Sequence, residues 1–338
     1  MTDLHYDTSK ANRMNYSAEV MGVLEQVLAI KEKYSEAGYS VKLVLLGDVV
    51  DGAMTQADEA MRCVDLLRFY TSLFSGTYAV LGNHEQTYTE GNPFWFLVSE
   101  LADPDLKKIS RALQPQSVNA CIEVPATLED GNVVFHFNHY GTPPKLPSEQ
   151  DKVHIGLFHQ NVGSNDICKM WGTFDDVEEA SYVQGYNYCY FGHMHMAYGK
   201  YYLNEAHTCL AEWLGTACRT NVLEVENAPL EFNVPAVIVE EGVFTRVEDN
   251  YVTRGAARDV IDYAKLNNTR AMAEQVRIIR EIVGSHVTGN TLFECVQSAA
   301  AVDGLDSLLN LLDGSFEQVR SLYKRGFEES IQGQESEE

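Results

Sequence analysis

Acidic, amide and imidazole side chains follow four apolar segments of the chain. Apolar runs of this length are typical of β-strands buried on both faces. Open α/β sheets collect ligands at the carboxyl ends of such strands, so we expect these side chains to meet at one sheet edge. The runs and the residues that follow them are 43–46 with Gly47-Asp48, 77–81 with Gly82-Asn83-His84-Glu85, 153–158 with His159, and 186–191 with Gly192-His193-Met194-His195.

Asp48 would lie at the end of a buried strand, where a carboxylate is costly unless a positive charge meets it. Gly47 lets the backbone turn sharply as it leaves the sheet. Near the N-terminus, Asp3 and His5 present a carboxylate and an imidazole two positions apart, and both reach one ion in extended or loop geometry. Nitrogen and oxygen ligands together suit a borderline metal. These residue types therefore indicate a pair of metal ions.

The composition is that of a soluble globular chain. Its 338 residues are 45% apolar, and no apolar run approaches the length of a membrane span. No secretory signal is visible, and the seven cysteines contain no Cys-x-x-Cys pair. We therefore expect a cytoplasmic protein with free thiols and no membrane segment.

The formal net charge of −24 bears on the substrate. A surface this acidic repels nucleic acid, so contact with DNA or RNA would need metal ions, local basic patches or a basic partner. The alternative is that the acidity only serves solubility.

Helical periodicity predicts three helices in the first hundred residues. Ser17 is a favourable N-cap for the first helix, and Gly38 ends it. Residues 56–74 form the second, and 93–101 form a short helix with proline in its first turn. The first two helices connect the metal-ligand segments and apolar runs in the manner of βαβ units.

Beyond residue 118 the pattern changes to short β-rich segments separated by turn signals. They predict a part of the chain dominated by antiparallel strands. Two sheets packed face to face, with helices outside, would satisfy both parts of the pattern. The segments are 118–124, 132–138, 153–158, 187–191, 199–203, 208–213, 220–225 and 236–240.

The last quarter of the chain changes character again, near residue 254. Residues 255–331 have apolar positions at helical spacing and are predicted to be wholly helical. Residues 332–338 read as an acidic disordered tail. The sequence therefore divides into an α/β domain over 1–250, a helical region and a tail.

Five motifs follow one another in order: Asp-x-His, Gly-Asp-x-x-Asp, Gly-Asn-His-Glu, His and Gly-His-x-His. This series resembles the calcineurin-like metallophosphoesterase family over residues 1–240. The resemblance implies a mixed α/β fold, a four-layer αββα sandwich, with 1–250 as its catalytic domain and a helical C-terminal region. It also implies a hydrolase. A phosphodiester is an anion attacked by water, and two metals can clamp it and lower the pKa of the attacking water.

The resemblance implies a ligand set for each of two divalent ions. Mn²⁺ is favoured, with Mg²⁺, Fe, Zn²⁺ and Ni²⁺ left open. The first ion would be held by Asp3, His5, Asp48 and His195. The second would be held by Asp48, Asn83, His159 and His193.

Two further residues would act beside the metals. The resemblance implies that His84 is not a ligand but faces the leaving group as general acid or phosphate stabiliser. Asp51 would hold His84 in its tautomer and raise its basicity. The other five histidines are interpreted as structural or surface residues; they are His136, His139, His154, His207 and His286.

Within the family, residues 157–161 and 214–220 resemble the nuclease subunit of SbcC–SbcD-type DNA-repair complexes. In such complexes a helical C-terminal region docks on the coiled coil of an ATPase partner, and 255–331 could do the same. Equally, these helices could cap the sandwich or form a small domain of their own. Glu85 favours another branch, because glutamate at this position is common in protein phosphatases.

Three functions follow from these patterns. The leading one is an SbcD-type DNA nuclease or exonuclease. The second is a phosphatase or phosphodiesterase acting on nucleotides, cyclic nucleotides or phosphoproteins, which the acidity favours. The third is a degenerate scaffold without catalysis. A homodimer is compatible with all three.

One feature departs from the family pattern. An apolar strand normally precedes Asp-x-His, but only Met1 and Thr2 precede Asp3 here, so either this strand is missing or the true start of the protein lies upstream. We therefore expect Asp3 and His5 to hang from a mobile terminus, which would weaken the first metal site.

Overall fold

The computed structural model describes the parts of the chain that carry all the predicted site residues. They belong to one compact unit, Met1–Asp262. The predicted helices over 255–331, the tail over 332–338 and the predicted strand over 220–225 lie outside the described residues. The described residues are 1–6, 16–54, 56–87, 91–101, 120–144, 146–149, 151–160, 162–163, 178–179, 183–195, 199–203, 208–218 and 230–255.

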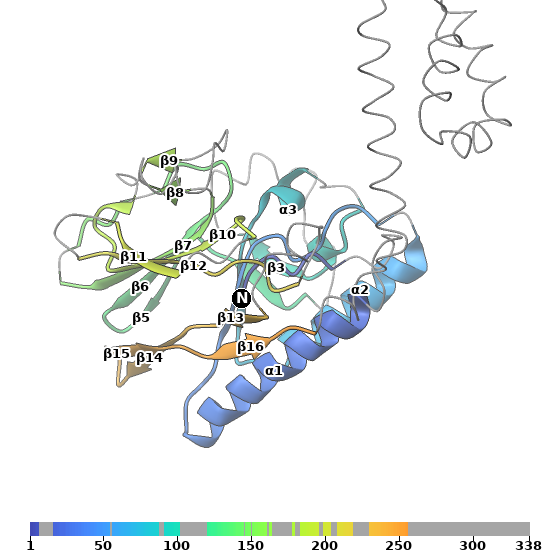
Figure 1. Cartoon of the computed structure of the whole chain (residues 1–338), viewed down its shortest axis with the longest axis horizontal. Helices are drawn as coiled ribbons and strands as arrows, with labels where there is room; N and C mark the ends of the chain where they lie inside the picture. The colour runs from blue at the N-terminus through green and yellow to red at the C-terminus, as the bar shows by residue number, and fades with distance from the viewer. Residues whose placement is uncertain are drawn as a thin grey trace, which may run out of the picture. The chain divides into compact units, whose positions relative to one another are not determined.

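The first sheet has four parallel strands in the order β1-β2-β4-β3. Leu43 is aligned with Thr77 and Leu46 with Val80, so β1 and β2 end level with each other. The segments that follow them, with Asp48 and Asn83, therefore leave from one edge. Figure 1 shows the chain coloured from blue at the N-terminus, with β3 of this sheet labelled. The strands are β1 (Leu43–Leu46), β2 (Thr77–Val80), β3 (Val98–Leu101) and β4 (Ile122–Val124).

The second sheet has six strands in the order β11-β12-β10-β7-β6-β5. Its four central strands are parallel, and only the two edge strands run antiparallel. The predicted dominance of antiparallel strands is therefore wrong for the sheet centre. The strands are β5 (Thr127–Asp130), β6 (Val133–Asn138), β7 (Val153–His159), β10 (Tyr188–Gly192), β11 (Gly199–Tyr202) and β12 (Leu210–Trp213).

The two sheets pack face to face through an apolar layer. Leu46 and Val80 of the first sheet join Phe137, Ile155 and Tyr190 of the second in one buried cluster. Strands β1 and β2 accordingly contact β6 and β7. The predicted α/β sandwich is confirmed in this part of the chain.

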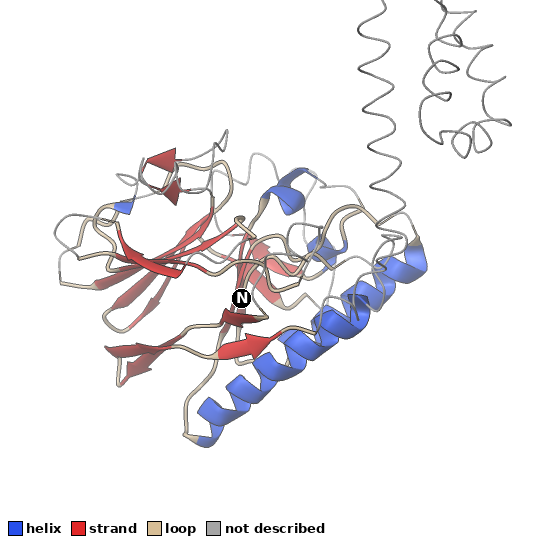
Figure 2. Cartoon of the chain, viewed as in Figure 1, coloured by secondary structure: helices blue, strands red, loops and turns tan. Residues whose placement is uncertain are grey.

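Two long helices accompany the first sheet (Figure 2). Helix α1 (Tyr16–Glu36) buries Val20, Val23, Leu24 and Val27, which lie on one helical face. Gly38 ends the turn beyond it with a φ of 92°, a conformation that favours glycine. Helix α2 is Ala57–Thr71.

The segment predicted as a helix over 93–101 is not one. A single 3₁₀ turn, η1 (Pro93–Phe96), is followed by the parallel strand β3. Val98 pairs with Ile122 of β4, so tertiary pairing overrides the local proline signal. Short helix α3 (Asn83–Thr87) also went unpredicted, and it carries two site residues.

Three two-stranded sheets complete the described structure. The β14–β15 hairpin turns through Glu241 and Gly242, both with positive φ, as a tight hairpin requires. Only β14 was predicted among these strands. They are β8 (Val162–Gly163) with β9 (Glu178–Glu179), β13 (Glu231–Asn233) with β16 (Tyr251–Thr253), and β14 (Ala236–Glu240) with β15 (Val243–Glu248).

The expected mobility of the N-terminal segment is not what the structure shows. Residues 1–6 run along β1 and the segment after it, held by backbone hydrogen bonds. Leu46 donates to the carbonyl of Met1, Asp3 donates to Gly47, and His5 donates to Asp48. Both predicted ligands on this segment are almost fully buried. Asp3 and His5 are therefore held in place both by backbone hydrogen bonds and by the groups packed around their side chains.

A buried histidine pair links β6 and β7 away from the predicted ligands. His136 Nε2 lies 3.0 Å from His154 Nδ1, and His154 Nε2 lies 2.6 Å from the carbonyl of Glu149. The carbonyl requires a proton on His154 Nε2, so Nδ1 accepts and His136 donates. This supports the structural interpretation of both residues. Burial, helped by His154, lowers the pKa of His136 to about 4.

The histidine pair predicts a loss of stability in acid. The unfolded His136 takes up a proton below its ordinary pKa of 6.5, whereas the folded form resists protonation down to about 4. The free energy of unfolding should therefore fall as the pH drops from about 6.5 to 4. We expect about 1–2 kcal/mol from this residue, since part of its solvation survives. Urea unfolding of wild type and His136→Gln across this range measures it. A wild-type curve parallel to that of the variant would contradict the assignment.

Candidate metal centre

The predicted ligands gather where β1, β2, β7 and β10 end. Their donor atoms form three overlapping groups, and within each group the atoms lie within 4.8 Å of one another. Asn83 joins the last group, with Oδ1 3.2 Å from His159 Nε2. The groups are Asp3 with His5 and His195, His5 with Asp48 and His84, and Asp48 with His159 and His193. All nine predicted site residues lie in this region, and their roles remain predictions.

Asp3 is fully buried and divides its two oxygens between different tasks. Oδ2 accepts the backbone N–H of His193 at 3.0 Å and also contacts the Thr2 hydroxyl. Oδ1 has no hydrogen-bond partner and faces His5 Nε2 at 3.6 Å and His195 Nε2 at 3.4 Å. One oxygen thus fixes the carboxylate, and the other is left for a cation.

Asp48 repeats this division with the opposite oxygens. Oδ1 accepts the backbone N–H of His84 at 2.9 Å. Oδ2 lies 3.2 Å from His159 Nε2, 3.7 Å from His5 Nε2 and 3.9 Å from His84 Nε2. Because this oxygen faces imidazoles of both predicted ligand sets, Asp48 is placed to bridge two ions.

Oxygen atoms fix the orientation of three imidazoles. His159 Nδ1 donates to the carbonyl of Leu46 at 2.6 Å, and His5 Nδ1 lies 3.1 Å from Asp51 Oδ1. His84 Nδ1 lies 2.5 Å from the carbonyl of Asp51. Each contact places a proton on Nδ1 and leaves Nε2 as a lone-pair donor toward the site.

Asp51 contacts two imidazoles of the site. Its Oδ1 lies 3.1 Å from His5 Nδ1 and 3.5 Å from His84 Nδ1. Its carbonyl also contacts His84 Nδ1. Asp51 is thus placed for the predicted contact with His84, and the structure adds a contact with His5.

Close backbone packing brings these segments together. Asp3, His5, Asp48 and His193 all have positive φ, between 46° and 73°. Such angles are sparsely populated outside glycine and persist where the surroundings over-determine them. A Cβ on Gly82 would lie 2.1 Å from Asp48 Oδ1, so only glycine fits between the two ligand segments. Local strain concentrates at this site.

Pairing with imidazoles favours the ionised form of the buried carboxylates. Burial alone would raise the pKa of Asp3, but His159, His195 and His5 outweigh it and hold that pKa well below its ordinary value. Burial alone would lower the pKa of His159, yet Asp48 and Asp3 raise it to about 9. Carboxylates that stay ionised in a buried place stabilise cations there.

The donor set therefore fits two divalent ions. The unpartnered Asp3 oxygen faces two imidazole nitrogens that are only 3.0 Å apart, an arrangement that a shared cation stabilises. Mixed nitrogen and oxygen donors suit Mn²⁺, Fe, Zn²⁺ or Ni²⁺ better than Ca²⁺ or Mg²⁺. Asp3, His5, Asp48 and His195 would hold one ion, and the other set would hold the second.

Three residues near the site were not singled out by their sequence. Glu85 and Thr216 are fully buried and hydrogen-bond the backbone of ligand segments. Tyr140 is half-buried, with its ring centroid 5.1 Å from that of His193. Single polar or aromatic residues carry no spacing signal, although Glu85 belongs to a predicted motif.

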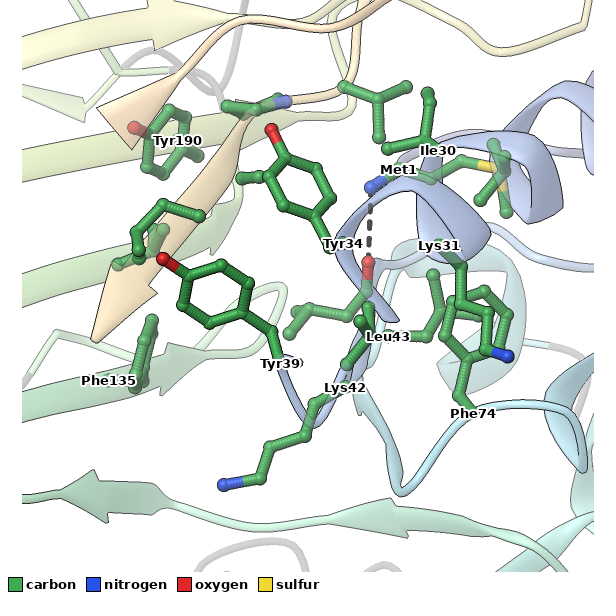
Figure 3. Close-up of a pocket in the computed structure, with 18 of the residues that line it drawn as sticks. Met1, Ile30, Lys31, Tyr34, Tyr39, Lys42, Leu43, Phe74, Phe135 and Tyr190 are labelled. Atoms are coloured by element: carbon green, nitrogen blue, oxygen red, sulfur yellow. Dashed lines mark hydrogen bonds between the residues drawn. The ribbon is translucent and has the colours of Figure 1, made fainter. Parts of the chain in front are cut away.

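A separate cavity of about 230 Å³ lies between α1, β1 and β14 (Figure 3). Its lining is largely apolar, with Phe74, Phe135 and Tyr190 among the residues, and Tyr34 and Tyr39 nearby. None of the predicted ligands lines it. This cavity therefore contributes nothing to the chemistry at the strand ends.

The sequence and fold were compared with known proteins. A family model described as calcineurin-like phosphoesterase matches residues 1–197. No curated protein matches the chain. No helix among the described residues is long and apolar enough to cross a membrane.

Solved structures with a similar fold come from Thermus thermophilus. The sulfate thiohydrolase SoxB, in complex with glycerol, has 10% identity and a TM-score of 0.35, over 71% of this chain and 44% of that one. A 5′-nucleotidase precursor has 12% identity and a TM-score of 0.35, over 76% of this chain and 52% of that one. The chain thus spans about half the length of each.

The geometry predicts two bound ions and a stability that depends on them. Titration of the metal-free chain with Mn²⁺ in a calorimeter should give two ions per chain. At one hundred times the dissociation constant each ion should stabilise the fold by about 2.7 kcal/mol, so a chelator should lower the melting temperature. Asp3→Asn should remove one ion, whereas Asp130→Asn, on an exposed carboxylate bonded to Lys42, should remove none. Two ions bound by Asp3→Asn with wild-type affinity would contradict the ligand assignment.

Proposed function

The chain belongs to the calcineurin-like phosphoesterase family, and from this premise we propose that it is a two-metal phosphodiesterase that cleaves DNA. The observation that carries the proposal is the shared carboxylate. Asp48 Oδ2 faces His159 at 3.2 Å and His5 at 3.7 Å, and these residues belong to different ligand sets. Two bound ions would neutralise the phosphate and lower the pKa of the attacking water.

His84 supplies the protein's own chemistry beside the ions. Its Nδ1 is held by the carbonyl of Asp51, so Nε2 faces the site, 3.9 Å from Asp48 Oδ2. About a quarter of its side chain is exposed, which leaves it accessible to a substrate oxygen. With a second proton on Nε2, the imidazolium form of His84 can donate that proton or a hydrogen bond to the leaving group.

The choice of DNA rests on the segments that resemble SbcD-type nucleases. Gln160, one of those residues, donates from Nε2 to the carbonyls of His139 and Thr142. These contacts fix the loop that carries Tyr140 beside the second ligand set. A half-buried ring at that position can stack on a base or another planar group of a substrate.

The net charge favours a second candidate, a phosphatase or phosphodiesterase for nucleotides or cyclic nucleotides. A charge of −24 opposes a polyanion far more than a mononucleotide. Tyr140 would serve this function equally well.

One assay distinguishes the candidates. Mn²⁺-dependent hydrolysis is measured with bis-p-nitrophenyl phosphate, linear DNA and cyclic nucleotides side by side. We expect turnover of the chromogenic diester and of DNA. His84→Ala should reduce it by about 10²–10⁴-fold, the usual contribution of a general acid. It should keep both ions in calorimetry. Loss of an ion would make His84 a ligand, and turnover of cyclic nucleotides alone would select the second candidate.

The proposed DNA nuclease also predicts a role for the C-terminal region. Arg254 is buried and its guanidinium donates to the carbonyls of Thr216 and Ala217, so a truncation must retain it. Deleting residues 263–338 should preserve folding and hydrolysis of bis-p-nitrophenyl phosphate, because a small diester needs only the ions and His84. It should reduce cleavage of long DNA, through loss of partner or substrate docking. Insoluble protein, or unchanged DNA cleavage, would contradict the docking role.

A further inference from the structure

We infer that Glu85 and Thr216 are positioning residues, each holding one half of the metal centre in place. This inference rests on the proposed two-metal function; it assigns Glu85 to the segment of the shared ligand Asp48 and Thr216 to the segments of Asp3 and His195. Both residues are fully buried, and both hydrogen-bond backbone groups of ligand segments rather than facing the ions.

Glu85 anchors the segment that carries the shared ligand. One carboxylate oxygen accepts the N–H groups of Asp48 and Gly82, both at 2.9 Å. The other accepts those of Val49 at 2.8 Å and Val50 at 3.4 Å. Four buried donors, three from the turn after β1 and one from the loop after β2, therefore depend on one side chain.

This arrangement explains how Asp48 keeps its positive φ. A residue with φ of 47° persists where its surroundings fix it, and its own N–H is fixed by Glu85. The N–H of Gly82 donates to the same carboxylate. This contact fixes where α3 begins and where Asn83 lies. Because Asp48 bridges the two ligand sets, disturbing Glu85 should affect both ions.

Thr216 anchors the other half. Its hydroxyl lies 2.7 Å from the carbonyl oxygen of Asp3 and 2.5 Å from that of Cys218, so it lies between these two segments. Its N–H donates to the carbonyl of His195 at 3.0 Å. One residue thus joins the two segments that supply three of the four ligands of the first ion. The neighbouring Ala217 donates to the carbonyl of Thr2 at 3.0 Å and strengthens the same junction.

Arg254 supports the loop that carries Thr216 and Ala217. It lies far along the chain, yet its guanidinium donates to the carbonyls of Thr216 and Ala217 and stacks on the Phe232 ring at 4.9 Å. The loop with Thr216 is therefore fixed on both sides. Asp3 and His195 are consequently placed by contacts that do not involve Glu85.

Substitutions of Glu85 and of Thr216 should change the affinities for the two ions in different ways. Removing an outer partner of a metal site typically costs 10–100-fold in affinity. Thr216→Val removes the hydroxyl and keeps the shape, so it should weaken one of the two ions by that factor and spare the other. Glu85→Gln replaces one acceptor oxygen by an amino group that cannot accept the buried N–H groups, so it should weaken both.

The test is calorimetric titration of the full chain with Mn²⁺ alone, with circular dichroism to verify folding. Thr216→Ser should restore wild-type binding. The matched controls lie away from the ligands and should leave both affinities unchanged. Thr71→Val removes a buried hydrogen bond to Leu67, and Glu212→Gln replaces one oxygen of a buried carboxylate that accepts from Asn233. If Thr216→Val fails to fold, Arg254→Lys loosens the same loop and should weaken the same single ion.

The outcomes separate this inference from the function it rests on. Wild type binding fewer than two Mn²⁺ ions would overturn the two-metal function and the anchors with it. Two ions in wild type and unchanged affinities in folded Thr216→Val and Glu85→Gln would overturn the anchors alone. Equal weakening of both ions by both variants would overturn the division into halves. If the two Mn²⁺ affinities change as predicted but no diester is hydrolysed, the positioning roles of Glu85 and Thr216 are confirmed and the proposed activity is wrong.

Discussion

The burial of two carboxylates at one sheet edge is the constraint on which the rest of the structure depends. Asp3 and Asp48 are 0% and 1% exposed, and both face the same imidazole of His5. Like charges so placed, away from water, destabilise a fold unless cations or protons balance them. Each carboxylate therefore has one oxygen tied to a backbone N–H and the other directed at imidazoles. The buried hydrogen bonds of Glu85 and Thr216 and the close approach of Gly82 hold that geometry, including its strained φ angles.

The sheet topology makes such a cluster feasible. Parallel strands β1 and β2 end level with each other, and β7 and β10 end together in the facing sheet. The ligands that follow these four strands come from distant parts of the sequence, yet they meet within a few residues of the strand ends. The N-terminal segment supplies the remaining two by pairing along β1. Its backbone hydrogen bonds to β1 and the segment after it also explain why Asp3 and His5 are well placed.

Most residues of the candidate site and part of the fold could be predicted from the sequence. Motif order and apolar runs sufficed for the ligand region, because residues such as Asp48 and His159 follow strands whose pattern is strong. The direction of the strands in the second sheet was not predictable from turn signals, since long connections separate β6 (Val133–Asn138), β7 (Val153–His159) and β10 (Tyr188–Gly192). The 93–101 segment was mistaken for a helix because pairing with β4 outweighs the local signal of Pro93.

The residues that the sequence did not single out share a physical reason. Glu85 and Thr216 act on backbone groups, and neither a periodic pattern nor a ligand spacing marks such a contact. Asp51 was singled out as the partner of His84, but no spacing marked its additional contact with His5. Side-chain chemistry at the ions can be inferred from residue types, because few side chains can do it. Support of the backbone can come from any buried acceptor or donor, so it becomes visible only when the segments are seen in contact. The outer supports of such a site therefore require a structure, even where its ligands do not.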